Sequence, residues 1–335
     1  MNMRANGLVV AIDGPSGAGK STAGRTLAAQ LGYTYIDTGA MYRALALKAM
    51  QAGVSLDAEE ALATLCRASR IELSDRGRRV RLDGHDVTAE VRSREISRAS
   101  SLVSVHPGVR VEMVTRQREL GKDGGVVLDG RDIGSAVFPD AEVKFYLDAN
   151  PGARTQRRLG VLRAAGSDAS FDAVEREVRE RDYTDTHRAE SPLVRAWDAL
   201  ALDTTKLSPE EVVERMLAAV RAREGKPLDL GRLAETHRRG PRRYLEALRS
   251  GQLSAGLYRL RKGETDEQGP HNEEEIYLVM EGRGRFRMGD EDFAVEPGYL
   301  FTVPARVEHG FHGVAEDLLL FVFFAPPEGA VAQGE

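Results

Sequence analysis

The stretch GPSGAGKS, residues 14–21, follows directly on the apolar run LVVAI and Asp13. It fits the pattern G-x-x-x-x-G-K-[S/T] and leads into STAGRTLAAQL (21–31), which is typical of a helix. Glycines allow backbone N–H groups to turn inward, and the positive end of the helix adds to their attraction for anions. The stretch therefore predicts a loop that holds a nucleoside triphosphate. Its binding residues would be Gly14, Pro15, Ser16, Gly17, Ala18, Gly19, Lys20, Ser21 and Thr22.

Within this loop, two side chains have specific predicted roles. Lys20 is expected to reach the outer phosphates and to act in catalysis, and the hydroxyl of Ser21 is expected to ligate Mg²⁺. Binding of ATP with Mg²⁺ is the resulting prediction.

The composition is that of a globular protein of two or more domains. The chain has 335 residues, of which 41% are hydrophobic and 30% charged. A net charge of −5 argues against general nucleic-acid binding. Cys66 has no second cysteine to pair with. Because LVVAI is too short for a signal peptide or a membrane span, we expect a cytoplasmic protein without a membrane partner.

Strand and helix signals alternate over the first 220 residues. Short apolar runs predict buried strands, and longer stretches with apolar residues on one face predict helices. The expected strands are 7–12, 34–37, 124–130, 143–149 and 200–203. The expected helices are 21–31, 40–53 and 208–223, the last with Ser208 as N-cap and Pro209 in its first position. This alternation indicates an α/β fold with a mostly parallel sheet between helices.

Residues 71–92 break the alternation of strands and helices. They alternate apolar and polar residues around the turn signals Asp75–Gly77 and Asp83–Gly84, which predicts small antiparallel strands. The insert is either a substrate-specific flap or a hairpin without a role in binding.

The pattern changes after residues 225–231. The next twenty residues are charged and predict short helices, and from Leu257 short strands alternate with glycine and proline. An all-β sandwich or barrel is the expected fold of this part. The expected domains are therefore 1–226, a helical linker over 227–250, and 251–330.

A kinase requires a second pocket that neutralises an anionic acceptor, and arginines collect away from the loop. RDYTDTHR (181–188) places Arg181, Asp185 and Arg188 on one face of an expected helix. Such residues are often only surface ion pairs, but several of these clusters lie near strand ends, where ligands bind. The other clusters contain Arg43, Arg110, Arg131, Asp132, Arg154, Arg157 and Arg158.

The first 225 or so residues resemble the bacterial cytidylate kinase family. The strings that carry the resemblance are AIDGPSGAGKST, IDTGAMYRA, SSLVSVHPGVR, LDGRDIGS and RDYTDTHRAESPL, in the order found in that family. The resemblance implies the P-loop nucleoside-monophosphate kinase fold with an antiparallel insert. It also implies transfer of the γ-phosphate of ATP to CMP or dCMP by a monomeric domain.

The resemblance also implies roles for individual residues. Thr38, Tyr42 and Arg43 would line the monophosphate site, and Ser101, Arg110 and Asp132 would read the cytosine edge. Arg43, Arg131 and Arg188 would bind the acceptor phosphate, and Arg181 and Asp185 would face the ribose. Arg154, Arg157 and Arg158 would belong to a lid over ATP. Lys20, Arg131, Arg158 and Arg188 are the expected catalytic residues.

Two points about the kinase stay open. Asp129, at the end of an apolar strand, either holds Mg²⁺ through water or caps a turn. The alternative to CMP as acceptor is another nucleoside monophosphate. No general base is expected, because phosphoryl transfer depends on positioning and charge neutralisation.

The carboxy-terminal part resembles the cupin family, whose fold is a small β-barrel. PHNEEEIYLVMEGRGRFRMG and VEPGYLFTVPARVEHGFH carry the resemblance. It implies that His271, Glu275 and His309 ligate a divalent metal, with Zn, Fe, Mn and Ni all suited to this ligand set. Gly269 stands where the family often has a further histidine, so Gln268 or Glu273 would have to substitute. The alternative is a polar pocket mouth without metal, and His312 is expected at the rim.

The role of the cupin part is open. It either senses a small molecule or metal and tunes the kinase, or performs an unrelated function in nucleotide or carbohydrate metabolism. Cupins often pair through their barrels, so a dimer formed in this way is the expectation for the chain.

Overall fold

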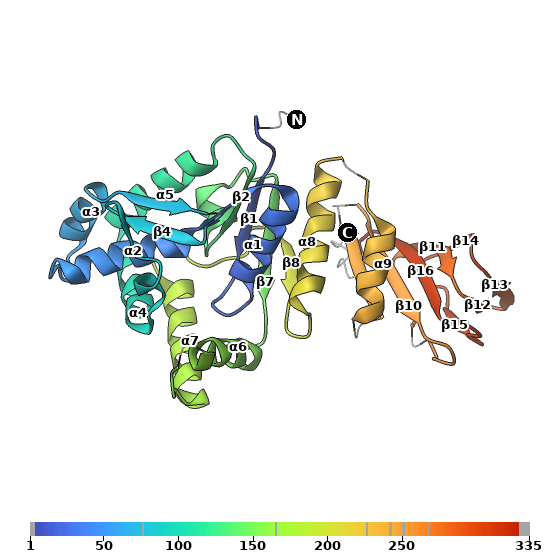
Figure 1. Cartoon of the computed structure of the whole chain (residues 1–335). Helices are drawn as coiled ribbons and strands as arrows, with labels where there is room; N and C mark the ends of the chain where they lie inside the picture. The colour runs from blue at the N-terminus through green and yellow to red at the C-terminus, as the bar shows by residue number, and fades with distance from the viewer. Residues whose placement is uncertain are drawn as a thin grey trace. The chain divides into compact units, whose positions relative to one another are not determined.

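The computed structural model describes residues 4–75, 77–164, 166–225, 227–240, 243–249, 252–266 and 268–327. The chain forms two compact units, residues 1–213 and 214–335 (Figure 1). Of the expected domain bounds, residues 226, 250, 251 and 330 lie outside the described residues. No helix in the described ranges is both long enough and apolar enough to cross a membrane.

A parallel five-stranded sheet forms the centre of the amino-terminal unit, in the order β2-β6-β1-β7-β8. This confirms the predicted α/β fold. All five strands end with an aspartate, so five carboxyl groups gather at the edge where the strands of a parallel sheet end. The strands are β1 (Val9–Asp13), β2 (Thr34–Asp37), β6 (Val126–Asp129), β7 (Val143–Asp148) and β8 (Leu200–Asp203).

Seven α-helices of the described residues belong to the amino-terminal unit, and an eighth, α8, begins in it and continues into the second unit. Four of these helices, α1, α2, α7 and α8, overlap stretches where the sequence predicts helices. Helix α8 begins as expected, because Glu211 N–H donates to Ser208 Oγ at 3.2 Å and Ser208 N–H donates to Glu211 Oε2 at 2.8 Å. The helices are α1 (Lys20–Leu31), α2 (Thr38–Gln51), α3 (Glu59–Arg67), α4 (Arg94–Val103), α5 (Pro107–Gly121), α6 (Pro151–Ala164), α7 (Phe171–His187) and α8 (Pro209–Arg223).

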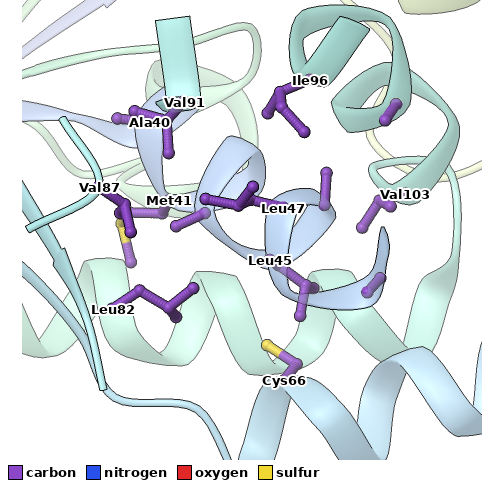
Figure 2. Close-up of a cluster of buried hydrophobic side chains, with 14 of the residues drawn as sticks. Ala40, Met41, Leu45, Leu47, Cys66, Leu82, Val87, Val91, Ile96 and Val103 are labelled. Atoms are coloured by element: carbon purple, nitrogen blue, oxygen red, sulfur yellow. The ribbon is translucent and has the colours of Figure 1, made fainter. Parts of the chain in front are cut away.

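The insert is antiparallel, as predicted, but shorter than expected. Its strands β3 (Ile71–Ser74), β4 (Arg79–Leu82) and β5 (His85–Asp86) end at Asp86, and residues Glu90–Arg92 form the 3₁₀ helix η1. The chain turns inward there because Val87 and Val91 are buried in a core around α2. Figure 2 shows this core, in which side chains from the insert, α3 and α4 surround Leu45 and Leu47. The core thereby fixes the insert to the helix that carries Tyr42 and Arg43.

The carboxy-terminal unit contains two antiparallel sheets, with strand orders β14-β11-β16-β10-β9 and β13-β12-β15. This confirms the expected all-β barrel. Aromatic side chains, among them Tyr277, Phe286 and Phe311, fill the space between the sheets. The strands are β9 (Tyr244–Arg249), β10 (Ser254–Leu260), β11 (Glu274–Glu281), β12 (Gly284–Met288), β13 (Glu291–Val295), β14 (Leu300–Val303), β15 (His309–His312) and β16 (Leu318–Ala325).

The expectation of a purely helical linker over 227–250 is wrong. Helix α9 (Leu230–Arg239) is followed by strand β9, which pairs with β10. Along β9, Leu245 and Ala247 are buried and their neighbours are more exposed, the period of two that a half-buried strand requires. Arg259 of β10 donates to the carbonyls of His237, Arg238 and Gly240, and so satisfies the carboxy-terminal end of α9.

Candidate functional site

The loop between β1 and α1 contains three glycines in the left-handed region. Gly14, Gly17 and Gly19 have φ values of 139°, 80° and 94°, which side chains rarely tolerate. A Cβ on Gly14 would lie 1.9 Å from the carbonyl oxygen of Leu147, so the loop packs directly on β7. No side chain caps α1 and its first turn has no acidic residue. The N–H groups of this helix end are therefore oriented to bind an anion.

Lys20 is buried at the first position of α1. Its Nζ donates to the carbonyl oxygens of Gly14 and Pro15, at 2.7 Å each. Burial lowers the pKa of Lys20 well below its usual range, and the positive charge of Arg131 lowers it further. The Lys20 side chain thus folds back over the loop. This is the loop that is predicted to hold the phosphates that Lys20 contacts.

A cavity of about 620 Å³ brings the loop together with most of the other predicted residues. Its volume is in the range of small-molecule sites. Gly14, Pro15 and Arg154 are not among the lining residues. The predicted residues that line it are Ser16, Gly17, Ala18, Gly19, Lys20, Ser21, Thr22, Thr38, Tyr42, Arg43, Ser101, Arg110, Arg131, Asp132, Arg157, Arg158, Arg181, Asp185 and Arg188.

Asp132 forms the centre of one charged cluster in this cavity. Its Oδ2 accepts a hydrogen bond from Arg110, and its Oδ1 lies 3.2 Å from the guanidinium of Arg188. All three residues are buried. Because an unpaired buried charge is costly, each side chain holds the others in place. A carboxylate and two guanidiniums can together read both acceptor and donor groups on a ligand.

A second cluster lies around Asp185 of α7. Arg131 Nε donates to Asp185 Oδ2 at 2.6 Å, and Arg181 Nε lies 4.0 Å from the same oxygen. Burial would raise the pKa of Asp185, but Arg131 and Arg181 hold it below its usual range. Burial, with the charge of Arg131, lowers the pKa of Arg181 to about 10. Two guanidiniums therefore share one carboxylate and leave an excess of positive charge.

The prediction that Arg188 shares a helix face with Arg181 and Asp185 is wrong. Helix α7 ends at His187, and Arg188 has the extended backbone angles φ −63° and ψ 142°. The carbonyl of Asp185 accepts the N–H of Leu193 at 2.7 Å instead of the N–H of residue 189, which a continued helix would require. Arg188 nevertheless lines the cavity, because it turns towards Asp132.

Asp129 contacts the loop from the end of β6. Ser21 Oγ donates to Asp129 Oδ2 at 2.6 Å, and Tyr35 OH donates to Asp129 Oδ1 at 2.8 Å. Burial raises the pKa of Asp129, and the charge of Asp37 raises it further. The hydroxyl predicted to ligate Mg²⁺ and this carboxylate are thus adjacent, and such oxygen ligands suit that ion.

The expected monophosphate site is built mainly on α2. Thr38 Oγ1 donates to the carbonyl of Asp129 at 2.7 Å, and Arg43 pairs with Asp37 at 3.0 Å. Burial raises the pKa of Tyr42 to about 12, so its hydroxyl stays protonated and can donate. These three side chains lie along one wall of the cavity.

The three expected lid arginines on α6 differ in their surroundings. Arg154 is buried, donates to the carbonyl of Ser16 at 3.2 Å and pairs with Asp182 at 2.6 Å. Arg157 donates to Thr204 Oγ1 at 3.0 Å, and burial lowers the pKa of Arg158. Arg154 thus supports the loop from behind, whereas Arg157 and Arg158 line the cavity.

Sequence reasoning missed several lining residues. Ser97, Ser100 and Ser104 come from α4 and the residue that caps it, and their helical spacing in SRASSLVS (97–104) is the signal that could have identified them. Thr204 follows β8 at the carboxyl edge of the sheet, and its Oγ1 donates to the carbonyl of Ala18 at 3.0 Å. Arg25, Asp37 and Arg92 carry no such signal in the sequence.

In the carboxy-terminal unit, His271, Glu275 and His309 form a cluster whose possible ligand atoms all lie within 4.8 Å. Glu275 Oε1 is 3.2 Å from His271 Nε2, and Oε2 is 2.9 Å from His309 Nε2. The outer nitrogens are held by other groups: His309 Nδ1 is 2.8 Å from the carbonyl of Val307, and His271 Nδ1 is 3.3 Å from Glu273. Both imidazoles therefore direct Nε2 towards Glu275, an orientation typical of metal-binding histidines.

The residues considered as substitutes at the Gly269 position lie outside this three-residue cluster. Glu273 faces the outer nitrogen of His271, and Gln268 accepts a hydrogen bond from Tyr277 OH at 2.9 Å. His312, expected at the rim, pairs with Asp292 at 3.0 Å. Burial would lower the pKa of His309, but the neighbouring Glu275 carboxylate raises it above its usual value.

Residues 10–222 match the family model described as cytidylate kinase. The chain belongs to the cytidylate kinase family. A cytidylate kinase from Geobacillus sp. (strain WCH70) is 49% identical over 222 residues, which cover 66% of this chain and 99% of that protein. A cytidylate kinase from Bacillus pumilus is 50% identical over 214 residues, covering 63% of this chain and 95% of that protein.

Residues 256–324 of the chain match the model described as cupin domain. An RMLC-like cupin from Shewanella frigidimarina is 21% identical and covers 26% of this chain and 77% of its own, with a TM-score of 0.25. The prediction of a kinase domain followed by a cupin domain is confirmed.

Proposed function

We propose that this protein transfers the γ-phosphoryl group of ATP to CMP or dCMP, giving ADP and CDP or dCDP. The observation that carries the proposal is the Asp132 cluster, which shares one cavity with the phosphate-binding loop. A phosphoryl donor and a pyrimidine acceptor can therefore be held in the same enclosure.

On the donor side, the loop N–H groups and Lys20 bind the phosphates of ATP. Ser21 and, through water, Asp129 hold Mg²⁺, which neutralises charge that develops on the transferred group. Arg157 and Arg158 close over the donor, and Arg154 keeps the loop in shape through the carbonyl of Ser16.

On the acceptor side, Arg43, Arg131 and Arg188 neutralise the monophosphate. Thr38 and Tyr42 complete this wall, and Arg181 with Asp185 faces the ribose. The hydroxyls and guanidiniums supply donors whose positions are fixed by the fold, so that they can neutralise charge that develops during transfer. No side chain is assigned as general base, since the acceptor phosphate is itself an anionic nucleophile.

The base is read by Ser101, Arg110 and Asp132. The exocyclic amine of cytosine donates hydrogen bonds, so the carboxylate of Asp132 is its natural partner. Arg110 and Ser101 can donate to O2 and N3. A base with an acceptor in place of the amine would set an oxygen against this buried carboxylate, which is a strong form of discrimination.

Turnover with CMP, dCMP, UMP and AMP at equal concentrations tests this function. CMP or dCMP is expected to have the highest kcat/KM. A higher value for UMP or AMP would contradict the proposed role of Asp132.

For the cupin unit, we propose that His271, Glu275 and His309 hold one divalent transition metal. Support comes from the ligand atoms of these three side chains, which converge within 4.8 Å of one another and have no other hydrogen-bond partner among the described residues. Zn, Fe, Mn and Ni all suit two imidazoles and a carboxylate.

We further propose a kinase domain over residues 1–226 and a cupin domain that includes strand β9, since β9 pairs with β10. We also propose that two chains pair through the cupin barrels. Light scattering of the full chain and of residues 1–226 distinguishes a cupin-mediated dimer from a kinase-mediated one. A monomeric full chain would contradict the pairing.

A further inference from the structure

Asp13, the last residue of β1, has no part in the reaction as described above. Its side chain is buried, with 4% of the residue exposed. Oδ1 accepts the N–H of Ile133 at 2.8 Å, and Oδ2 accepts the N–H of Gly134 at 2.7 Å. One carboxylate therefore holds two successive backbone groups of the segment that follows β6.

These two N–H groups begin a short π-helix, η2 (Ile133–Val137). The first N–H groups of a helix have no partners within it, and the residue before a helix often caps them with its own side chain. Asp132 occupies that capping position, yet its side chain makes no capping hydrogen bond. Asp13 caps η2 in its place, and the carboxylate of Asp132 is thereby left to pair with Arg110 and Arg188.

The same strand end supports the donor loop. Asp13 immediately precedes Gly14, and the N–H of Gly130 donates to the carbonyl of Ile12 at 2.9 Å. Arg131 and Asp132 thus lie on a backbone segment tied to β1 at both ends, by Gly130 before them and by Ile133 and Gly134 after them. Small displacements of binding groups reduce rates strongly, so this attachment bears directly on acceptor binding.

We propose that Asp13 is a positioning residue, whose carboxylate fixes the backbone that carries Arg131 and Asp132 and so sets acceptor affinity and base selection. The proposal deepens the proposed function and rests on it. Asp13 is not among the lining residues of the cavity, so it would act through these two residues.

The test is the variant Asp13→Asn in the full chain. Asparagine has the same shape but only one acceptor oxygen, so one of the two N–H groups loses its partner. We expect the KM for CMP to rise at least about tenfold and the ratio of kcat/KM for CMP over UMP to fall by a similar factor. Binding of a fluorescent ATP analogue should change by less than about twofold, because the donor loop keeps its own contacts.

Glu142→Gln is the matched control. The Glu142 carboxylate accepts the N–H of Val9 at 2.8 Å, at the opposite end of the same strand. This variant should lose stability without a change in the KM for CMP. An unchanged KM and unchanged base ratio in Asp13→Asn, or equal changes in both variants, would overturn the proposal.

Amide hydrogen exchange of the wild-type chain provides a test that does not depend on the folding of a variant. The amides of Ile133 and Gly134 should exchange as slowly as those of β1. Unprotected amides would contradict the proposal. Failure of the wild type to phosphorylate CMP would instead contradict the proposed function, so the two failures are distinguishable.

Discussion

Arg131 Nε donates to Asp185 Oδ2 at 2.6 Å, although 54 residues separate them in the chain. The pair joins the segment after β6 to α7 across the cavity. It keeps the Arg131 guanidinium in one orientation. Burial would lower the pKa of Arg131, but the Asp185 carboxylate raises it, so the group stays charged. The acceptor site therefore depends on a carboxylate from a distant helix.

Asp185→Asn should lower kcat/KM for CMP at least about tenfold, equivalent to ~1.4 kcal/mol of transition-state stabilisation. The variant leaves the guanidiniums of Arg131 and Arg181 together without their shared counter-charge. Steady-state kinetics measures the effect. Glu175→Gln, which breaks an exposed pair with Arg179 on the same helix, should leave kcat/KM unchanged. Equal effects in the two variants would contradict the special role of the buried pair.

Lys20→Ala should abolish measurable phosphoryl transfer, with kcat reduced by roughly 10²–10³-fold or more. The lysine is the only side chain that donates to the Gly14 and Pro15 carbonyls in the hydrogen bonds of the described residues. The melting temperature should change little, since a buried charge is removed together with its bonds. Retained turnover would exclude Lys20 from the mechanism.

Asp129→Asn distinguishes the two roles considered for this carboxylate. If Asp129 holds Mg²⁺ through water, the Mg²⁺ concentration for half-maximal turnover should rise several-fold. Tyr35→Phe, which removes only the hydrogen bond to Asp129 Oδ1, is the matched control and should raise this Mg²⁺ concentration less. An unchanged Mg²⁺ requirement in Asp129→Asn would contradict the role in Mg²⁺ binding and favour the alternative, in which Asp129 only caps a turn.

His309→Ala should eliminate stoichiometric metal from the cupin unit, as measured by elemental analysis of tag-free protein after loading. His312→Ala is the control, because His312 lies on the same strand but pairs with Asp292. It should retain the metal. Substoichiometric metal in the wild type after loading would end the proposal that these side chains bind an ion.

Protonation of His237 should destabilise the carboxy-terminal unit in acid. Burial lowers the pKa of this residue to about 4, from an ordinary value of 6.5. The unfolded chain therefore binds the proton more tightly, and stability is lost as the pH falls below 6.5. The loss should approach ~1.4 kcal/mol per pH unit until about pH 4.

Urea unfolding at several pH values measures this dependence. His237→Gln, whose amide can still donate towards the Arg243 carbonyl that His237 Nε2 approaches at 2.9 Å, should remove most of the slope. The same slope in both proteins would assign it to other groups.

Local patterns in the sequence were sufficient for the strands of the parallel sheet and for the phosphate loop. Each is a continuous run or a short motif whose spacing reflects backbone geometry. The grouping of His271, Glu275 and His309 was instead implied by the resemblance to cupins.

Strand β9 was missed because Glu246 and Arg249 interrupt its apolar residues within a strongly charged stretch. Helix α4 was missed although its buried Ile96, Ala99 and Val103 recur at helical spacing. Helix α5 has no clear apolar face and gains its stability from packing around α2.

The pairing of charges could not be predicted from the sequence. Nothing in LDGRDIGS indicates that Asp132 leaves its helix uncapped, or that Asp13 replaces it from another strand. Likewise, helical spacing placed Arg188 on α7, whereas a tertiary hydrogen bond to Asp185 ends that helix first. Such contacts depend on which distant groups meet after folding.

Because Gly14 has no Cβ, the phosphate-binding loop packs directly against the carbonyl of Leu147 in β7. The sheet therefore holds the loop in its binding conformation before a nucleotide arrives. Such preorganisation spares the incoming nucleotide the entropic cost of ordering its own receptor. Even alanine at this position would force the loop away from β7, and ATP binding would then have to include the free-energy cost of ordering the loop.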